Sequence, residues 1–400
     1  MGSKTITLGV LTLVLGVFYQ TILKDWLYLN FGIGRTYTHL EDYHYKCRRL
    51  EHPLLSACED LFLDYEGRAV YAACSTVESR RGWIPGGNHY NVSQRTLEDH
   101  VSVLKIDEPG EDGFYGLHQL EITGGYKGVD HHNSIDVHGF DVEILPDSRR
   151  RFWMINHRPP VDESENFLDA TKLGANSTVE VFDLVPGSKN LEFVKTVANP
   201  IINTPNNIAA TGDGGFVFSN DHPAKTGFIR SLVKMIGGGN IAMCEPDNKC
   251  HSGPSNRFPN GIVQGQDGLY YVASSMKGKI SVYSLEANHT FTHIDEIDLR
   301  TVIDNLSVDA NGDILAAGFL DVRKVHKSLV DPTVGAPSAA FRIRKLDTED
   351  GGWKYVVTKI LEDIDAKVLS AATSVVHDPK TGQLFFGCLT APFIVVCEKV

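Results

Sequence analysis

The feature that most constrains the fold is a short turn that recurs six times along the chain. Each copy is rich in Asp, Gly or Asn and is followed at once by an apolar run of strand-forming residues. The copies begin at Asp64, Pro146, Gly212, Gln266, Asp309 and Asp378. Because Asn, Asp and Gly supply the positive φ that tight turns require, each copy predicts a β-hairpin.

Further strand-like runs follow several of these hairpins, for example residues 177–182 and 279–283. Three or four strands per unit, six units and no long helical pattern predict an all-β chain folded as a six-bladed β-propeller. A β-sandwich is the alternative fold, but about 350 residues of evenly spaced hairpins exceed its usual size of about 100 residues. The sequence therefore favours the propeller.

The residues just before each turn are polar where an ordinary strand would carry Val or Ile. The first strand of each propeller blade lines the central channel, so these residues are expected to converge on its axis. They are Glu59 and Asp60, His138 to Phe140, Asn206 and Asn207, Asn260, and Asp304 and Asn305. Carboxylate and amide oxygens are the ligands that calcium prefers, whereas zinc takes His and Cys. This pattern predicts a calcium site in the channel; the alternative is that the residues only form turns at strand ends.

The charge balance bears on the class of partner. The formal net charge is −12, so a nucleic-acid surface, which needs clustered Lys and Arg, is not expected. An acidic chain is compatible with cation binding but does not demonstrate it.

The N-terminal segment indicates the compartment. An apolar run follows Lys4, continues to Leu23 and is extended by Trp26 to Leu29, with no small-residue cleavage site after it. We expect residues 1–30 to be a retained signal anchor rather than a cleaved signal, and residues 31–400 to be the catalytic propeller. This predicts the secretory pathway, either anchored on the lumenal or extracellular side or secreted, with the helix contacting a membrane or lipid surface.

Sequons and cysteines agree with that route. Triplets at Asn91, Asn176 and Asn288 predict N-glycosylation, and a fourth match begins at Asn305. Seven cysteines leave at least one unpaired. Cys47 and Cys397 flank the propeller, where a disulfide would close its ring, and Cys244 and Cys250 could form a second. A zinc site at the latter pair is the weaker alternative, because no second pair of suitably spaced ligands accompanies it.

Seven short segments occur in order with a spacing that is specific when they are taken together. They are CEDLFLD at 58–64, VHGFDV at 137–142, INHRP at 155–159, PNNIAATG at 205–212, FSNDH at 218–222, PNGI at 259–262 and DNLSVDANGDI at 304–314. In these segments the chain resembles the serum paraoxonase and arylesterase family of calcium-dependent lactonases. Gluconolactonase-like and strictosidine-synthase-like propellers are related alternatives.

The resemblance implies a role for each matching residue. A catalytic calcium would be held by Glu59, Asn206, Asn260, Asp304 and Asn305. A second, structural calcium would be held by Asp60, Asn207 and the backbone carbonyl of Phe140. His138 and His157 match the histidine dyad of the family, and Cys47 and Cys397 match its ring-closing disulfide.

Two departures from the family pattern limit what can be carried over. The family has Asp at the position of Asn207, so the second calcium is expected to bind more weakly or to be absent. The family also carries an active-site His near the position of Phe319, which this chain lacks. The substrate range is therefore not expected to copy that of the mammalian enzymes.

The predicted function is a calcium-dependent hydrolase of esters or lactones, acting on a small-molecule substrate. Calcium would polarise the carbonyl, and His138 with His157, or a metal-bound carboxylate such as Glu59, would activate water. The alternatives are a non-hydrolytic propeller enzyme that catalyses condensation or cyclisation, and a non-catalytic binding propeller. Substrate specificity is expected to reside in three long segments, 76–100, 223–257 and 320–340, with Trp83, Tyr90, Phe228 and Met243 at an apolar entrance.

Overall fold

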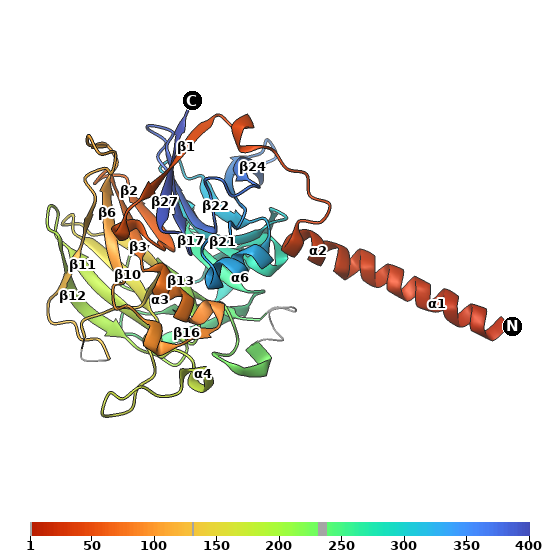
Figure 1. Cartoon of the computed structure of the whole chain (residues 1–400), viewed down its shortest axis with the longest axis horizontal. Coiled ribbons are helices and arrows are strands. Elements are labelled where there is room, and N and C mark those ends of the chain that lie inside the picture. The colour runs from red at the N-terminus through yellow and green to blue at the C-terminus, as the bar shows by residue number, and fades with distance from the viewer. Residues whose placement is uncertain (1, 130–131, 231–237) are drawn as a thin grey trace.

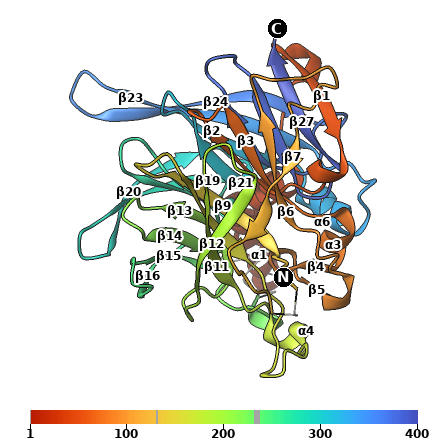
Figure 2. The same ribbon diagram turned by 90° about the vertical axis from the view of Figure 1, so that its left-hand side faces the viewer.

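The six predicted hairpins are the inner halves of six β-sheets arranged around a central channel (Figure 1; Figure 2). The structure is a computed structural model that describes residues 2–129, 132–230 and 238–400. Each predicted turn joins the first two strands of one blade. Two of these turns use glycines at positive φ, Gly268 at 76° and Gly312 at 82°, as their hairpins require. The six-bladed propeller is confirmed.

The first three blades run outward from the channel in strand order. The first blade consists of β2 (Asp60–Asp64), β3 (Ala69–Cys74), β6 (His100–Lys105) and β7 (His118–Gln119). The second consists of β9 (Val137–Ile144), β10 (Arg150–Asn156), β11 (Thr178–Leu184) and β12 (Asn190–Val197), and β8 (Glu121–Thr123) pairs in parallel with β12. The third consists of β13 (Pro205–Ala210), β14 (Phe216–Asn220), β15 (Asn240–Cys244) and β16 (Cys250–Ser255).

The remaining blades follow the same order, except that the last takes its outer strand from the N-terminal part. The fourth consists of β17 (Pro259–Gln264), β18 (Tyr270–Ser274), β19 (Lys279–Leu285) and β20 (Phe291–Asp298). The fifth consists of β21 (Val302–Val308), β22 (Ile314–Phe319), β23 (Ser338–Asp347) and β24 (Trp353–Asp363). The sixth consists of β25 (Ala372–His377), β26 (Leu384–Cys388), β27 (Phe393–Lys399) and β1 (Tyr45–Glu51).

Ring closure joins the two ends of the propeller. Strand β1 pairs antiparallel with β27 so that Cys47 lies opposite Cys397, and the two form the predicted disulfide. Arg68, in the β2–β3 turn, donates to both carboxylate oxygens of Asp378, in the β25–β26 turn, at 2.9 and 2.7 Å. Backbone pairing and a covalent bond therefore hold the N-terminal strand in the last blade, and the bidentate ion pair joins the first blade to the last.

Two further disulfides complete the set. Cys244 and Cys250 form the second predicted bond, and Cys58 pairs with Cys74, a bond that the sequence did not predict. Cys388 is buried and unpaired, the odd cysteine that the count required. The side chains of Asn91, Asn176 and Asn288 are exposed, as glycan acceptors must be, whereas the side chain of Asn305 is 1% exposed and excluded as an acceptor in the folded chain.

The helices lie outside the blades. The longest is formed by α1 (Gly2–Phe18), a wider turn at Tyr19–Leu23 and α2 (Lys24–Phe31), and α1 projects away from the propeller (Figure 1). Its stretch Gly9–Phe31 is long and apolar enough to cross a membrane, a test that signal sequences also pass. Three disulfides and this helix fit the secretory pathway. The boundary at residue 30 and the retention of the helix stay predictions.

Shorter elements lie between or over the strands. The helices are α3 (Val77–Gly82), α4 (Ala170–Leu173) and α6 (Val322–Val330), and a small hairpin is formed by β4 (Trp83–Ile84) and β5 (His89–Tyr90). Single helical turns occur at Leu40–Asp42, Pro53–Leu55, Pro85–Gly87, Val92–Gln94 and Ser275–Lys277. Of these, α6, β4 and the turns at Pro85–Gly87 and Ser275–Lys277 border the functional site.

Candidate metal and catalytic site

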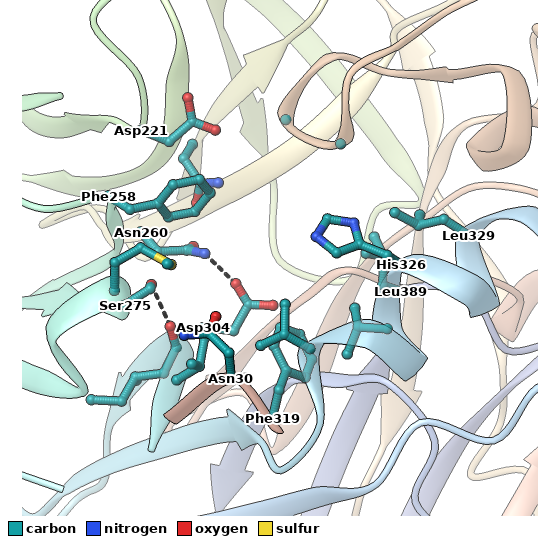
Figure 3. Close-up of a pocket in the computed structure, with 18 of the residues that line it drawn as sticks. Asn30, Asp221, Phe258, Asn260, Ser275, Asp304, Phe319, His326, Leu329 and Leu389 are labelled. Carbon is teal, nitrogen blue, oxygen red and sulfur yellow. Dashed lines mark hydrogen bonds between the residues drawn. The ribbon is translucent and has the colours of Figure 1, made fainter. Parts of the chain in front are cut away.

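The inner strands bring the predicted catalytic set to one end of the channel. The side chains of Glu59, Asn206, Asn260 and Asp304 line a single cavity of about 330 Å³, together with His138 (Figure 3). All five are at least nine-tenths buried. Four different blades supply the four oxygen-bearing side chains, because each stands at or just before the start of an inner strand. The convergence expected from the sequence is thus present.

Hydrogen bonds position these side chains relative to one another. The Asn305 amide donates to Glu59 Oε1 at 2.8 Å, and the Asn260 amide donates to Asp304 Oδ1. Asn305 itself does not line the cavity; it holds the Glu59 side chain, which does. An amide N–H group thus fixes the carboxylates of Glu59 and Asp304. The amide oxygen of Asn260 takes no part in its hydrogen bond to Asp304.

Three oxygens at this site lack a protein partner. Among the residues that the structure describes, none donates a hydrogen bond to Glu59 Oε2, Asn206 Oδ1 or Asn260 Oδ1. A buried acceptor without a donor costs about 1–3 kcal/mol, more if charged, so such atoms are rare singly and rarer in a group. Oxygens from a carboxylate and two amides around one cavity fit a hard divalent cation, which would serve all three at once.

The pKa values of the two carboxyl groups at this site, those of Glu59 and Asp304, are both raised. Burial raises the pKa of Glu59 to about 7, against a favourable hydrogen bond from Asn305. Burial, followed by repulsion from Glu59, raises the pKa of Asp304 well above its usual value. Two buried acids that repel each other are stabilised in their charged form by a cation between them.

The second predicted set lies further along the same strands and faces a different cavity, of about 490 Å³. Asp60 Oδ1 accepts from the Leu61 backbone N–H, and Oδ2 accepts from the Phe140 backbone N–H at 3.2 Å and from the Asn207 amide at 2.9 Å. The Asn207 amide also donates to Asn305 Oδ1 at 3.1 Å. Both oxygens of Asp60 are therefore satisfied by hydrogen bonds, in contrast to the first set.

The predicted histidine pair borders the first cavity. His138 Nε2 lies 3.9 Å from Glu59 Oε1, and the rings of His138 and His157 lie with centroids 5.0 Å apart. His157 Nδ1 is 2.9 Å from Ser177 Oγ, so this hydroxyl orients the second ring. Burial lowers the pKa of His138 to about 3 and that of His157 well below its usual value. Both imidazoles are neutral at pH 7 in the absence of other charges.

Asp221 is a site residue to which the sequence assigned no role. It lines the cavity, and its Oδ1 lies 2.7 Å from His222 Nδ1. Burial alone would raise the pKa of Asp221, but the imidazole of His222 and the guanidinium of Arg230 outweigh it and bring the pKa to about 2. It follows β14, the second strand of its blade, whereas the other channel residues lie at the starts of inner strands, so the pattern that identified them did not include it.

Several segments distant in sequence contribute to the walls of the cavity. They include α2, the turns at Pro85–Gly87 and Ser275–Lys277, and α6, from which His326 reaches into the cavity (Figure 3). The aromatic lining consists of Trp26, Phe31, Phe258 and Phe319.

Two of the three expected specificity segments, 76–100 and 320–340, therefore contribute to the cavity. In 223–257, residues 231–237 lie outside the described residues, and none of the described ones lines it. The prediction is wrong for two of the four expected entrance residues; of the others, Phe228 is exposed and Tyr90 is half-buried, and neither lines this cavity. Trp83 and Met243 are buried in the core, where the Trp83 indole donates to the His157 carbonyl at 2.9 Å.

Comparisons with known proteins identify a family for the chain. The sequence model of the Arylesterase family matches residues 162–398. Serum paraoxonase/arylesterase 1 of Mus musculus is 30% identical over 200 residues, covering 49% of this chain and 51% of that protein. Serum paraoxonase/arylesterase 2 of Homo sapiens is 26% identical over 275 residues, covering 68% of this chain and 70% of that protein.

These matches are partial. The chain spans 41% to 61% of the length of the paraoxonase/arylesterase 1 proteins of rat, mouse and human. Among solved structures, a gluconolactonase of Xanthomonas campestris superposes with a TM-score of 0.48 at 12% identity, covering 91% of this chain and 93% of that one.

Proposed function

The chain belongs to the arylesterase family, and from that premise we propose that it hydrolyses carboxylic esters or lactones in the cavity lined by Glu59 and Asp304, with one calcium ion held there. The observation that carries the proposal is the group of three buried oxygens, Glu59 Oε2, Asn206 Oδ1 and Asn260 Oδ1, to which no described residue donates. An ester hydrolase needs a Lewis acid or an oxyanion hole at its centre, and this oxygen-lined cavity could hold the former.

The donor set favours calcium over zinc. Calcium takes six to eight oxygen ligands, and this end of the channel offers two carboxylates and two amide oxygens with room for water or substrate. Zinc would call for imidazole or thiolate ligands, whereas the unpartnered atoms of this set are all oxygens, and His138 Nε2 stands 3.9 Å from Glu59 Oε1. When bound, the ion would polarise the substrate carbonyl and stabilise the negative charge that develops on its oxygen.

The chain's own residues then have to move a proton from water. His138 is neutral and adjoins Glu59, and His157 lies behind it with its ring fixed by Ser177, so the pair could accept a proton and pass it away from the cavity. Glu59 is the competing base: burial raises the pKa of its carboxyl in the metal-free chain, and a bound cation would lower that pKa again. We assign the base to His138, since Glu59 is needed as a ligand.

The substrate class follows from the walls. Trp26, Phe31, Phe258 and Phe319 surround a cavity of about 330 Å³, at the small end of ligand pockets. A compact ester or lactone with an apolar acyl or aryl group fits this lining. Phe319 adds an apolar ring to this wall at the position where the family carries a histidine.

The number of ions follows from Asn207. Its amide N–H groups take the place that a cation would occupy between Asp60 and Asn305. We therefore propose a single calcium per chain, with the residues of the second set, Asp60, Phe140 and Asn207, held together by hydrogen bonds.

The setting of the enzyme is also part of the proposal. We place it in the secretory pathway, glycosylated at Asn91, Asn176 and Asn288, with α1 held in a membrane or lipid surface. The exposed apolar side chains along α1, from Val10 to Phe18, support this arrangement.

The test is a panel of aryl esters and lactones, incubated with the full chain in calcium and in excess chelator. Hydrolysis should require calcium, and Asp304→Ala should lower kcat/KM by more than about 100-fold, the scale set by losing one stabilising group at a reaction centre. Asp350→Ala, which removes an exposed loop carboxylate, is the matched control. Hydrolysis that persists unchanged in chelator would sink the metal mechanism.

Two further outcomes separate the remaining alternatives. His138→Gln should lower kcat while calcium affinity is kept, whereas Glu59→Gln should lower both; if His138→Gln turns over normally, the base is Glu59. Esters and lactones that all stay intact would favour a condensing or cyclising enzyme, or a binding propeller without chemistry.

A further inference from the structure

A second cluster of metal-ligating side chains lies away from the channel, between the outer hairpins of the third and fourth blades. Glu245 directly follows β15, His251 is the second residue of β16, and His289 lies in the turn that joins β19 to β20. Strands β16 and β20 are the outermost strands of their blades, and no described strand pairs one blade with the other. The three side chains therefore meet across a boundary between two sheets.

Their geometry already approaches that of a coordination sphere. His251 Nε2 lies 2.5 Å from Glu245 Oε1, and His289 Nε2 lies 3.6 Å from Glu245 Oε2. The two imidazole rings face each other with centroids 5.1 Å apart and planes inclined by 18°. One ligand atom from each residue falls within 4.8 Å of the other two.

The backbone on both sides is fixed. Cys244 and Cys250 lie opposite each other in the β15–β16 ladder and are joined by a disulfide. Glu245 and His251 each directly follow one of these two cysteines in the chain. In the neighbouring blade the His289 N–H donates to the Glu286 carbonyl within a tight turn. The ligands are thus presented by two hairpins that need little rearrangement.

We propose that Glu245, His251 and His289 bind one zinc ion. Two imidazoles and one carboxylate are a ligand set that zinc takes with tetrahedral geometry, with water in the fourth position. Calcium is disfavoured, since the cluster offers carboxylate oxygens from one residue only. With zinc–ligand distances of about 2.0–2.1 Å, neighbouring ligand atoms stand about 3.3 Å apart. His251 and Glu245 would therefore move apart by less than 1 Å, roughly, and the His289 contact would hardly change.

The electrostatic surroundings suit a cation. The pKa of Glu245 is lowered by the hydrogen bond from His251 and by the nearby His289 and Lys249, so its carboxylate is charged at neutral pH. Asp247 adjoins Glu245, and Asp213 faces His289 from the β13–β14 turn. Lys249, 3.8 Å from Glu245 Oε1, is the one opposing charge among the described neighbours and is largely exposed, so it can turn away.

A zinc ion here would join two blades at their outer edge and would not touch the hydrolytic cavity. The expected consequence is a higher unfolding temperature in zinc, because a ligand that binds only the folded chain stabilises it. The inference is independent of the proposed hydrolase activity, which involves none of these residues.

The experiment uses the full chain saturated with calcium, titrated with zinc chloride by calorimetry and with cobalt(II) followed by visible absorption. One zinc site is expected, together with the intense cobalt bands of a tetrahedral site. His251→Ala and His289→Ala should each weaken zinc binding by more than about 100-fold, since loss of even an outer partner of a metal ligand costs about 10- to 100-fold. His293→Ala, on β20 but outside the cluster, should leave it unchanged.

Two results would overturn the assignment. One is a zinc titration that is the same for the natural chain and the His251→Ala/His289→Ala double variant. The other is a cobalt spectrum typical of octahedral coordination that neither substitution alters. His289→Asp, which returns an oxygen ligand to the same turn, should recover part of the affinity lost in His289→Ala and so separates ligation from damage to the hairpin.

Discussion

Replacing Asn207 by Asp should give the chain a second calcium site. The Asn207 amide donates to Asp60 Oδ2 at 2.9 Å and to Asn305 Oδ1 at 3.1 Å, so its nitrogen occupies the point between these oxygens. In Asn207→Asp a carboxylate oxygen takes that place. Two hydrogen bonds are lost, and two carboxylates then face each other inside the channel.

The size of the effect can be worked from the same contact. Two unit charges 2.9 Å apart repel by about 6 kcal/mol at an effective dielectric constant near 20. The lost hydrogen bonds add about 1–3 kcal/mol each, because their acceptors are buried. Without metal, the variant must take up a proton or unfold more easily. Calcium reverses the sign, because the added carboxylate becomes a ligand.

Two measurements check this prediction. Calcium stoichiometry, by calorimetry and by metal analysis after gel filtration, should rise from one ion in the natural chain to two in Asn207→Asp. The unfolding temperature of Asn207→Asp should fall in chelator and recover in calcium. Asn203→Asp adds the same charge a few residues earlier, outside the channel, and should do neither. Two ions in the natural chain, or an unchanged metal-free unfolding temperature in the variant, would refute the reasoning.

Two predictions concern ring closure. Burial would raise the pKa of Asp378, but hydrogen bonds from Arg68 bring it to about 2. Because this value lies below the unfolded pKa of about 3.9, the ion pair stabilises the fold above that pH. Its contribution is lost as the pH falls toward 2. Asp378→Asn should therefore unfold several degrees below the natural chain at pH 6, with the gap closing near pH 2.5; an equal gap at both would contradict this. Cys47→Ser opens a loop of 350 residues and should cost about 2–5 kcal/mol of stability in non-reducing buffer, clearly more than Cys244→Ser, whose loop spans 6 residues.

The parts of the fold that depend on local chemistry could be predicted from the sequence. A turn such as that at Gly268 needs only its own residues to specify a hairpin, and six such turns define six blades. Pairings that depend on distant strands could not be predicted. The parallel addition of β8 to β12 and the bond between Cys58 and Cys74 both depend on the register of neighbouring strands, which no local pattern encodes.

The site divides in the same way. The polar residues at the starts of inner strands were expected to converge, and they do, because strand starts in a propeller meet at the axis. The walls were less predictable. Trp26 and Phe31 come from α2, at the end of the segment that was expected to be a signal anchor, and His326 comes from α6. The strand repeats imply the position of neither helix. Whether an amide presents its oxygen or its nitrogen to a cavity is likewise a property of the whole hydrogen-bond network, not of the residue.

That last property links the chemistry of the channel to its stability. At the first set, no described residue donates to the amide oxygens of Asn206 and Asn260, and we propose that an ion completes this end of the channel. At the second set, the side-chain amide of Asn207 donates a hydrogen bond to the carboxylate of Asp60, so we expect no ion at that end. The propeller is closed independently by the bond between Cys47 and Cys397. Calcium should therefore be required for turnover but not for folding, and chelation should abolish hydrolysis at temperatures well below that at which the chain unfolds.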